Sequence, residues 1–253
     1  MCEDATFEVL GVRVDATQIP DVVRELKNWI VQGTASRWVA VTGMHGISVA
    51  QDDDGFKGIL NSADLVVPDG MPLVWIGRRK GHQNLKRRVY GPELIEEFCS
   101  ETESRFRHFF YGGAPGVADQ LASMLGERYG IRTVGTLSPP YGTISQADRE
   151  KVDSVLELAS PDIVWVGLST PKQERWMHIQ SGRSNIPAFV GIGAAFDFLT
   201  GRKRSAPKWM KEHGLEWFFR LIQEPRRLWR RYLVGGLKFL VFLFLERFRI
   251  RRF

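Results

Sequence analysis

The sequence has few of the residues that would place it among exported or metal-binding proteins. It contains only two cysteines, Cys2 and Cys99, which is too few for a disulfide framework, and their spacing matches no metal site. Its five histidines form no HExxH pair. The first residues are acidic and carry no apolar signal-peptide core. We therefore expect a protein that is not exported and works in a reducing cytosol.

An apolar run long enough to cross a membrane is missing as well. Leu233–Leu245 has thirteen residues and is broken by Gly235, Gly236 and Lys238. A bilayer-spanning helix needs about 20 apolar residues. Arginines flank the run on both sides, and Trp and Phe are frequent around it. This composition favours a helix that lies in the lipid interface, although the apolar stripe could instead face a second subunit in a homo-oligomer.

Charge is distributed unevenly along the chain. Residues 202–253 carry 15 Lys and Arg against 4 Asp and Glu, a net charge of +11, whereas the whole chain carries +6. The first 201 residues therefore carry −5. Because the basic charge coincides with Phe and Leu runs, it favours an anionic membrane surface over nucleic acid. We predict a catalytic domain over residues 1–201 and a basic helical membrane-binding appendage over residues 202–253.

Apolar strand-like runs alternate with amphipathic stretches through the first 201 residues. This pattern predicts an α/β fold with a parallel, Rossmann-like sheet and helices on both faces. The expected strands are Arg37–Val41, Asp64–Val67, His108–Tyr111, Ile163–Val166 and Ala188–Val190. The expected helices are Asp21–Val31, Pro92–Thr102, Gly116–Tyr129, Ser145–Ala159 and Pro171–Gln180.

Several of these strands run directly into glycines or turn residues. In open α/β sheets, ligands bind beyond the carboxyl ends of the strands. Gly112 and Gly113 follow one strand and precede a helix, where they would let a phosphate approach the backbone. A tight strand–helix turn explains them equally well. No GxGxxG sequence occurs.

Three polar segments are open to a structural and a functional interpretation. Asp69 precedes Gly70 at a strand end. The pair is either a turn dipeptide or the site of a general base. Residues 169–174 read as a helix start in which Thr170 is the N-cap, Pro171 is the first helical residue and Gln173 completes a capping box. Gln173 could also face a ligand. Residues 52–54 are three aspartates, which we interpret as a solvated loop or helix cap rather than a metal site.

Taken in order, the chain resembles the WecG/TagA/CpsF family of bacterial glycosyltransferases from about Phe7 to Tyr232. The resemblance depends on five strings in register: Ala63-Asp64 with Asp69-Gly70; Arg88–Leu94; Pro171-Lys172-Gln173-Glu174; Gly193–Phe198; and Arg204–Trp209 with Gly214–Trp217, leading into Arg220-Leu221 and Glu224–Arg227.

The resemblance implies an inverting transfer of a hexose from a UDP-sugar, with neither a metal nor another cofactor. It implies a polyprenyl-diphosphate-linked sugar acceptor on the cytoplasmic face of the bacterial plasma membrane, where the protein would be peripheral or monotopic. The products of such enzymes feed teichoic acid, enterobacterial common antigen, capsule or exopolysaccharide.

The resemblance also implies roles for individual residues. Asp69 matches the proposed catalytic base, which deprotonates the acceptor hydroxyl. The substrate-binding positions are Arg88 and Gln173 around the sugar and diphosphate, Tyr141 stacking on uracil, Asp197 at the nucleoside, and Arg220, Arg227 and Arg230 neutralising the leaving diphosphate.

One departure from the family pattern affects the donor. The family usually has Thr-x-Asn after the second strand, and here Thr42 is present but Met44 stands at the asparagine position, followed by His45. Met44 cannot supply the hydrogen bonds of an asparagine. Either His45 takes over this role or the sugar is held differently. UDP-N-acetylmannosamine, UDP-glucose or another hexose donor therefore remain open.

Two other classes of function compete with this interpretation. The first is a nucleotide-sugar-modifying enzyme, such as an oxidoreductase or epimerase. It would need a dinucleotide cofactor, and the missing GxGxxG argues against it. The second is a non-catalytic scaffold that docks on membranes through its tail, in which Asp69 would have no measurable role.

Overall fold

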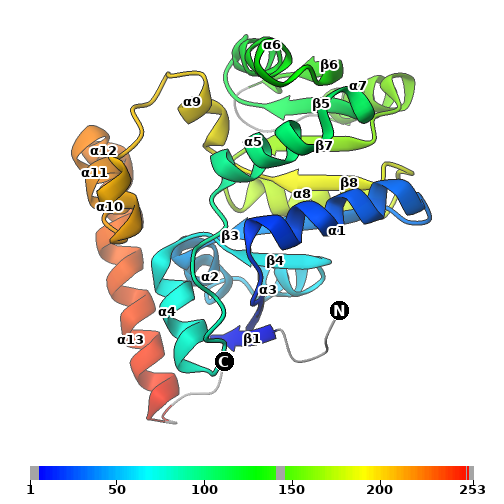
Figure 1. Cartoon of the computed structure of the whole chain (residues 1–253). Helices are drawn as coiled ribbons and strands as arrows, with labels where there is room; N and C mark the ends of the chain where they lie inside the picture. The colour runs from blue at the N-terminus through cyan, green and yellow to red at the C-terminus, as the bar shows by residue number, and fades with distance from the viewer. Residues whose placement is uncertain (1–5, 141–145, 249, 251–253) are drawn as a thin grey trace. The chain divides into compact units, whose positions relative to one another are not determined.

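The computed structural model describes residues 6–140, 146–248 and 250, and it contains a six-stranded sheet (Figure 1). The strand order is β4-β3-β8-β7-β5-β6, and the pairs β3–β8, β8–β7, β7–β5 and β5–β6 are parallel. The prediction of an α/β fold with a parallel sheet is confirmed. The strands of this sheet are β3 (Arg37–Thr42), β4 (Leu65–Pro68), β5 (Arg107–Gly112), β6 (Arg132–Leu137), β7 (Ile163–Gly167) and β8 (Ala188–Gly191).

Helices connect the strands and make up the C-terminal segment. Those before residue 205 are α1 (Ile19–Gln32), α2 (Met44–Ala50), α3 (Asp54–Asn61), α4 (Met71–Arg79), α5 (Gly91–Thr102), the 3-10 turn η1 (Glu103–Arg105), α6 (Val117–Tyr129), α7 (Gln146–Ala159), α8 (Lys172–Ser181) and α9 (Ala195–Leu199). Those after it are α10 (Lys208–Glu212), α11 (Glu216–Gln223), α12 (Pro225–Trp229), the π-helical segment η2 (Arg230–Val234) and α13 (Gly235–Arg247).

The chain divides into two compact units, each built from separate stretches of sequence. The first unit contains residues 1–18, 41–90 and 205–253. The second contains residues 19–40 and 91–204. The predicted division into a catalytic domain before residue 201 and a membrane-binding appendage after it is a division by function, and it stays a prediction.

The core of the second unit is made by its strands. The side chains of Phe109, Phe110, Val164, Trp165 and Phe189 are fully buried, as expected for strands that are covered on both faces. In Figure 1, α1 and α5 lie in front of these strands and α8 lies behind β8. The continuous apolar strands of this unit are therefore buried between layers of helices.

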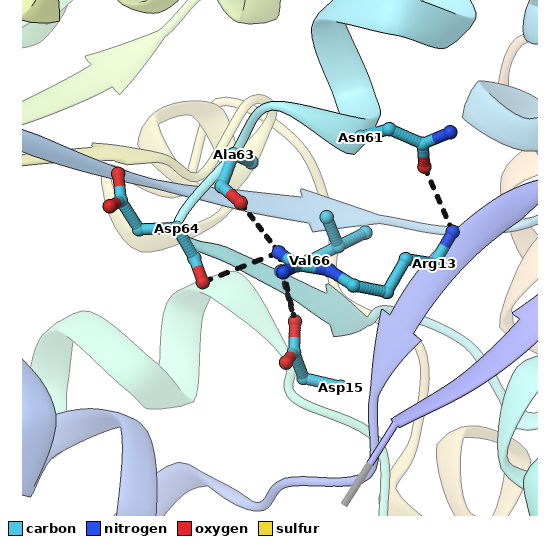
Figure 2. Close-up of polar contacts among 6 residues, drawn as sticks. All are labelled: Arg13, Asp15, Asn61, Ala63, Asp64 and Val66. Atoms are coloured by element: carbon cyan, nitrogen blue, oxygen red, sulfur yellow. Dashed lines mark hydrogen bonds and ion pairs between the residues drawn. The ribbon is translucent and has the colours of Figure 1, made fainter. Parts of the chain in front are cut away.

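The first unit contains a short antiparallel hairpin that is tied to β4. The hairpin strands are β1 (Thr6–Val9) and β2 (Val12–Asp15). Figure 2 shows how Asp15 accepts a hydrogen bond from the Val66 backbone N–H at 2.7 Å. Arg13 donates to the carbonyl oxygens of Ala63 and Asp64 at 2.5 and 3.3 Å. These contacts satisfy backbone groups of the segment that leads to Asp69.

The C-terminal helices belong to the packing of the first unit. Helix α13, red in Figure 1, packs against α2, where the methyl group of Met44 lies close to Gly236 and Ser48 donates to the Gly235 carbonyl at 3.4 Å. Lys238 pairs with Asp52, and Phe239 is buried. Within the part of the chain that is described, no helix has the length and apolarity needed to cross a bilayer.

The structure adds elements that the sequence pattern did not predict. The five expected strands and five expected helices all form, with bounds that shift by one or two residues. Strand β6 was missed because its sequence, RTVGTL, is half exposed and has no apolar run. The two hairpin strands have four residues each, too short for a periodic signal.

Candidate active site

Asp69 lies where β4 ends and α4 has not yet begun. Its backbone N–H donates to the Thr42 carbonyl at 2.7 Å, which links the ends of two strand segments. Gly70 follows with φ of 130°, a conformation that favours glycine and turns the chain into α4. A Cβ atom on Gly43 would lie 2.2 Å from the Asp69 carbonyl oxygen, so this approach also requires glycine. The backbone that carries Asp69 is therefore fixed on both sides.

The Asp69 carboxylate is partly open to solvent and partly buried. Its side chain is 37% exposed, yet Oδ1 is buried and has no hydrogen-bond partner among the described residues. Burial raises the pKa of Asp69, and the nearby Glu216 raises it further, whereas Arg88, Arg220 and Arg231 lower it. A carboxylate with a raised pKa and an oxygen that accepts no hydrogen bond is suited to accept a proton.

Arg88 forms an ion pair with Asp69. Its Nη1 lies 3.7 Å from Asp69 Oδ1, and its Nη2 donates to Glu216 Oε2. The guanidinium carbon also lies 4.2 Å from the centre of the Tyr90 ring, within cation–π distance. Lys211 lies 5.1 Å from the same ring. Arg88 is thus held by an aromatic ring and two carboxylates.

Two arginines and a histidine of the first unit complete this group. Arg220 on α11 and Arg231 in η2 lie near enough to Asp69 to lower its pKa. Burial, and after it the charge of Arg231, lowers the pKa of His45 to about 4, so His45 is a neutral imidazole at pH 7. Thr42 is buried beside it in the chain, and its hydroxyl has no hydrogen-bond partner among the described residues.

The other two arginines of the predicted set lie differently. Arg227 is exposed and pairs with Glu224 at 2.6 Å, although its charge reaches Arg231. Arg230 is exposed, and its guanidinium lies 5.3 Å from the centre of the Trp229 ring. The structure therefore groups Thr42, His45, Arg88 and Arg220 with Asp69, but not Arg230.

In the second unit, the predicted glycine turn forms at the end of β5. The Gly113 N–H donates to the Gly167 carbonyl at 3.0 Å, and Ser138 donates to the Gly112 carbonyl at 3.1 Å. Gly112 has φ of 129°, and a Cβ atom there would lie 2.6 Å from the Gly167 backbone. The ends of β5 and β7 therefore lie against each other, with no side chain between them.

Gln173 lies at the neighbouring strand end of the same unit. It is buried, and its Nε2 donates to Glu174 Oε1 at 3.1 Å and to the Gly191 carbonyl at 3.4 Å. Its Oε1 is buried without a hydrogen-bond partner among the described residues. An amide oxygen in this state can accept a hydrogen bond from a ligand.

The predicted capping box at this helix is wrong. Helix α8 begins at Lys172, and Pro171, which precedes it, caps it without a side-chain hydrogen bond. The Thr170 hydroxyl donates to Glu174 Oε1 at 2.8 Å, and the Gln173 side chain also turns to Glu174 and Gly191. The buried Glu174 carboxylate therefore accepts hydrogen bonds from both side chains that were expected to form the capping box.

The remaining predicted positions are distributed as follows. Asp197, on α9, pairs with Lys203 at 2.8 Å and remains one-quarter exposed. Tyr141 lies outside the described residues. Asp53 accepts from the Phe56 N–H at 2.9 Å as the N-cap of α3, which confirms the helix-cap interpretation of the aspartate run. Within residues 6–140, 146–248 and 250, no three His, Cys, Asp or Glu side chains cluster as a metal site would require.

Sequence reasoning missed two members of the group around Asp69. Glu216 appeared only inside the string Gly214–Trp217, and no periodicity marked it as a site residue. Arg231 was not among the arginines that the resemblance assigned to the diphosphate, and no local pattern separates it from the other arginines of the tail.

Comparison with known proteins shows the family of the chain. A model of the glycosyl transferase WecG/TagA/CpsF family matches residues 7–253. The chain therefore belongs to this family and is a glycosyltransferase.

Individual relatives carry a more specific name. The chain is 29% identical over 208 residues to the N-acetylglucosaminyldiphosphoundecaprenol N-acetyl-beta-D-mannosaminyltransferase of Bacillus subtilis, covering 82% of this chain and 78% of the relative. It is 30% identical over 186 residues to the enzyme of the same name from Bacillus spizizenii, covering 73% and 70%. The enzyme of that name from Staphylococcus aureus is 26% identical over 228 residues, covering 89% and 88%.

Proposed function

We propose that this protein transfers a hexose from a UDP-sugar to a polyprenyl-diphosphate-linked sugar during surface polysaccharide biosynthesis. Family membership supports this proposal, as do relatives whose names specify an N-acetylmannosaminyl group and an N-acetylglucosaminyl-diphospho-undecaprenol. UDP-N-acetylmannosamine is one candidate donor. UDP-glucose or another UDP-hexose is the alternative, because Met44 packs near Gly236 and offers no hydrogen bond to a sugar.

The observation that carries the proposal is the state of the Asp69 carboxylate. In the proposed reaction, Asp69 takes the proton of the acceptor hydroxyl while that oxygen attacks the anomeric carbon of the donor. The bond from that carbon to the UDP oxygen breaks, and the configuration inverts. The buried Oδ1 that accepts no hydrogen bond from the described residues, the partial exposure and the raised pKa of Asp69 support its role as the base.

The leaving UDP needs positive charge, and arginine side chains of the first unit supply it in this proposal. Arg220 and Arg231 are favoured because their charges reach Asp69. Arg227 and Arg230 remain candidates from the resemblance. Guanidinium groups bind phosphate oxygens in pairs and can fill the electrostatic role that a metal fills in other transferases.

In the second unit, nucleotide and sugar binding is assigned to the strand-end groups. Gly112 and Gly113 would admit a phosphate to the backbone, and the free Gln173 Oε1 would accept a hydrogen bond from a sugar or nucleoside hydroxyl. Asp197 would bind the nucleoside after rearranging its ion pair with Lys203. Tyr141 is retained as the proposed partner of the uracil ring.

The tail is proposed to bind the cytoplasmic face of the plasma membrane. Among the described residues, fourteen of the eighteen exposed large apolar side chains lie within residues 209–250. Leu240→Glu with Phe244→Glu is expected to abolish sedimentation with anionic vesicles. The control Leu158→Glu, at a 90% exposed leucine elsewhere, is expected to leave it unchanged. If both proteins still sediment, the apolar face has another occupant, and the molar mass in detergent-free buffer then tests a homo-oligomer.

The decisive experiment is a transfer assay with purified full-length protein in detergent. It uses a polyprenyl-diphosphate-linked N-acetylglucosamine acceptor, a panel of UDP-hexoses, and Asp69→Asn as the matched variant. We expect product with one donor and a loss of turnover of at least ~100-fold in Asp69→Asn, with UDP binding and the melting temperature retained. Equal turnover in both proteins would show that Asp69 is not the base.

A further inference from the structure

Glu216 is a buried acid whose partner lies far away in the sequence. Its side chain, at the start of α11, is 8% exposed, and its Oε2 accepts a hydrogen bond from Arg88 Nη2 across 128 residues of sequence. A buried carboxylate is stable only when it is paired and hydrogen-bonded. Glu216 and Arg88 therefore form an ion pair inside the first unit.

Arg88 stands between this acid and the proposed base. Its Nη1 is 3.7 Å from Asp69 Oδ1, which is an ion-pair distance but too long for a hydrogen bond. The Tyr90 ring, 4.2 Å from the guanidinium carbon, limits movement of the group on another side. Asp69 Oδ1 has no hydrogen-bond partner among the described residues, even though an arginine lies beside it.

We propose that Glu216 is a positioning residue: by holding the Arg88 guanidinium, it prevents a direct hydrogen bond from Arg88 to Asp69 and keeps Asp69 available as a proton acceptor. The inference rests on the proposed function of Asp69. A carboxylate that is locked to a guanidinium in a close or bidentate pair is a weak base, because that pair stabilises the ionised form.

The charges that face Asp69 agree with this role. Glu216 raises the pKa of Asp69, whereas Arg88, Arg220 and Arg231 lower it. His45 and Tyr90 are uncharged at pH 7, because burial lowers the pKa of His45 to about 4 and raises that of Tyr90. Lys211 Nζ lies 5.1 Å from the centre of the Tyr90 ring. Without Glu216, three guanidinium groups would face Asp69 as the only carboxylate of the group.

The test is a carboxyl ¹³C NMR titration of the full-length protein labelled at aspartate. The Asp69 signal is identified by its loss in Asp69→Asn. In Glu216→Gln, which keeps the length of the side chain, we expect the Asp69 titration midpoint to move to lower pH. Glu246→Gln, which removes one negative charge from α13, is the matched control, and no shift is expected there. If Glu216→Gln does not fold, Glu216→Met is the second variant, with the same expected shift.

A double-mutant cycle separates positioning from simple charge repulsion. If Glu216 acts through Arg88, the shift caused by Glu216→Gln at least halves in the Arg88→Gln background. A shift of the same size in both backgrounds would show that Glu216 acts on Asp69 only through its negative charge, and it would overturn the inference. An unchanged or raised midpoint in Glu216→Gln would overturn it as well.

Activity gives an independent readout and separates this inference from the proposed function. We expect the acid limb of kcat/KM in Glu216→Gln to move to lower pH and kcat at pH 7 to fall by ~10-fold, with UDP binding retained. If the wild-type protein makes no product while the Asp69 midpoint still depends on Glu216 through Arg88, the proposed function fails and the positioning role stands. If product forms but the midpoint does not respond, only the positioning role fails.

Discussion

The two units of the molecule carry different kinds of chemical groups. The first unit gathers ionised side chains around Asp69, namely Arg88, Glu216, Arg220 and Arg231. The second unit presents backbone and neutral groups at its strand ends: Gly112 and Gly113 beside Gly167, and the amide of Gln173 beside Gly191. In the proposed function, proton transfer at the first set of groups and ligand binding at the second place different demands on the sequence.

The comparison implies two kinds of sensitivity to mutation. A glycine held by the backbone of a neighbouring strand tolerates no side chain, so its substitution affects folding. A charged side chain near Asp69 that is only half-buried, such as Arg231, can be replaced with less structural change, so its substitution affects turnover. The following predictions test this contrast, beginning with the largest expected effect.

Gly112→Ala should strongly destabilise the second unit. The new Cβ atom would lie 2.6 Å from the Gly167 backbone, and φ of 129° is strained for alanine. We expect the free energy of unfolding to fall by more than ~3 kcal/mol, measured by denaturant titration. Gly126→Ala, in the open interior of α6, is the control and should raise stability by ~1 kcal/mol. A Gly112→Ala protein as stable as the wild type would contradict the strand-end geometry.

Arg231→Ala should lower turnover more than Arg230→Ala. The charge of Arg231 reaches Asp69 from a half-buried position, whereas Arg230 is exposed over Trp229. Removing one preorganised electrostatic group from a reacting centre typically reduces kcat by ~100-fold. We expect a loss of this order for Arg231→Ala and less than ~10-fold for Arg230→Ala, measured as kcat with saturating donor. The reverse order would show that Arg230 meets the diphosphate.

His108 should make the stability of the second unit depend on pH without affecting catalysis. It is fully buried, and Trp165 Nε1 donates to its Nδ1 at 3.1 Å, so the ring is neutral. Burial lowers its pKa from 6.5 to about 4. The unfolded chain binds the proton first, so this stability is complete above pH 6.5 and is lost as the pH falls towards 4.

His108→Gln keeps an acceptor for Trp165 but cannot titrate. Between pH 7.5 and pH 5, we expect the free energy of unfolding to fall by ~2 kcal/mol less in this variant than in the wild type. Comparing the two proteins removes the contribution of His45, which titrates in the same direction. Identical pH profiles would mean that the pKa of His108 is the same in the folded and unfolded states.

The parts of the fold that were predictable have a strong local signal. Five buried strands and the five helices α1, α5, α6, α7 and α8 follow from apolar runs and amphipathic stretches, because burial on both faces leaves a continuous pattern. Helices α2, α3, α4 and α9, which lie among the same strands, were not predicted. Strand β6 and the β1–β2 hairpin were not predicted, because their stability depends on neighbouring elements rather than on their own residues. Gly135 of β6, for example, leaves room for the Phe109 ring on the adjacent strand.

The site was predictable where local sequence and chemistry coincide. Asp69 stands at a strand end before a glycine, and the resemblance points to Arg88 and Gln173. Glu216 was not predictable, because its partner Arg88 lies 128 residues away and no local pattern records that pairing. The prediction of a capping box from Thr170 and Gln173 was wrong, because the local sequence does not show that both side chains donate hydrogen bonds to buried Glu174.

The order of chain synthesis gives the discontinuous first unit a further consequence. A ribosome makes proteins from the N-terminus, and domains generally fold as units once their residues are available. The second unit has all its residues when Arg204 is made, whereas the first still lacks residues 205–253. A nascent chain that stalls before α11 carries Asp69 and Arg88 without Glu216, and its α2 helix has no α13 to cover it. The group of side chains around Asp69 is therefore complete only after the last helices have been synthesised.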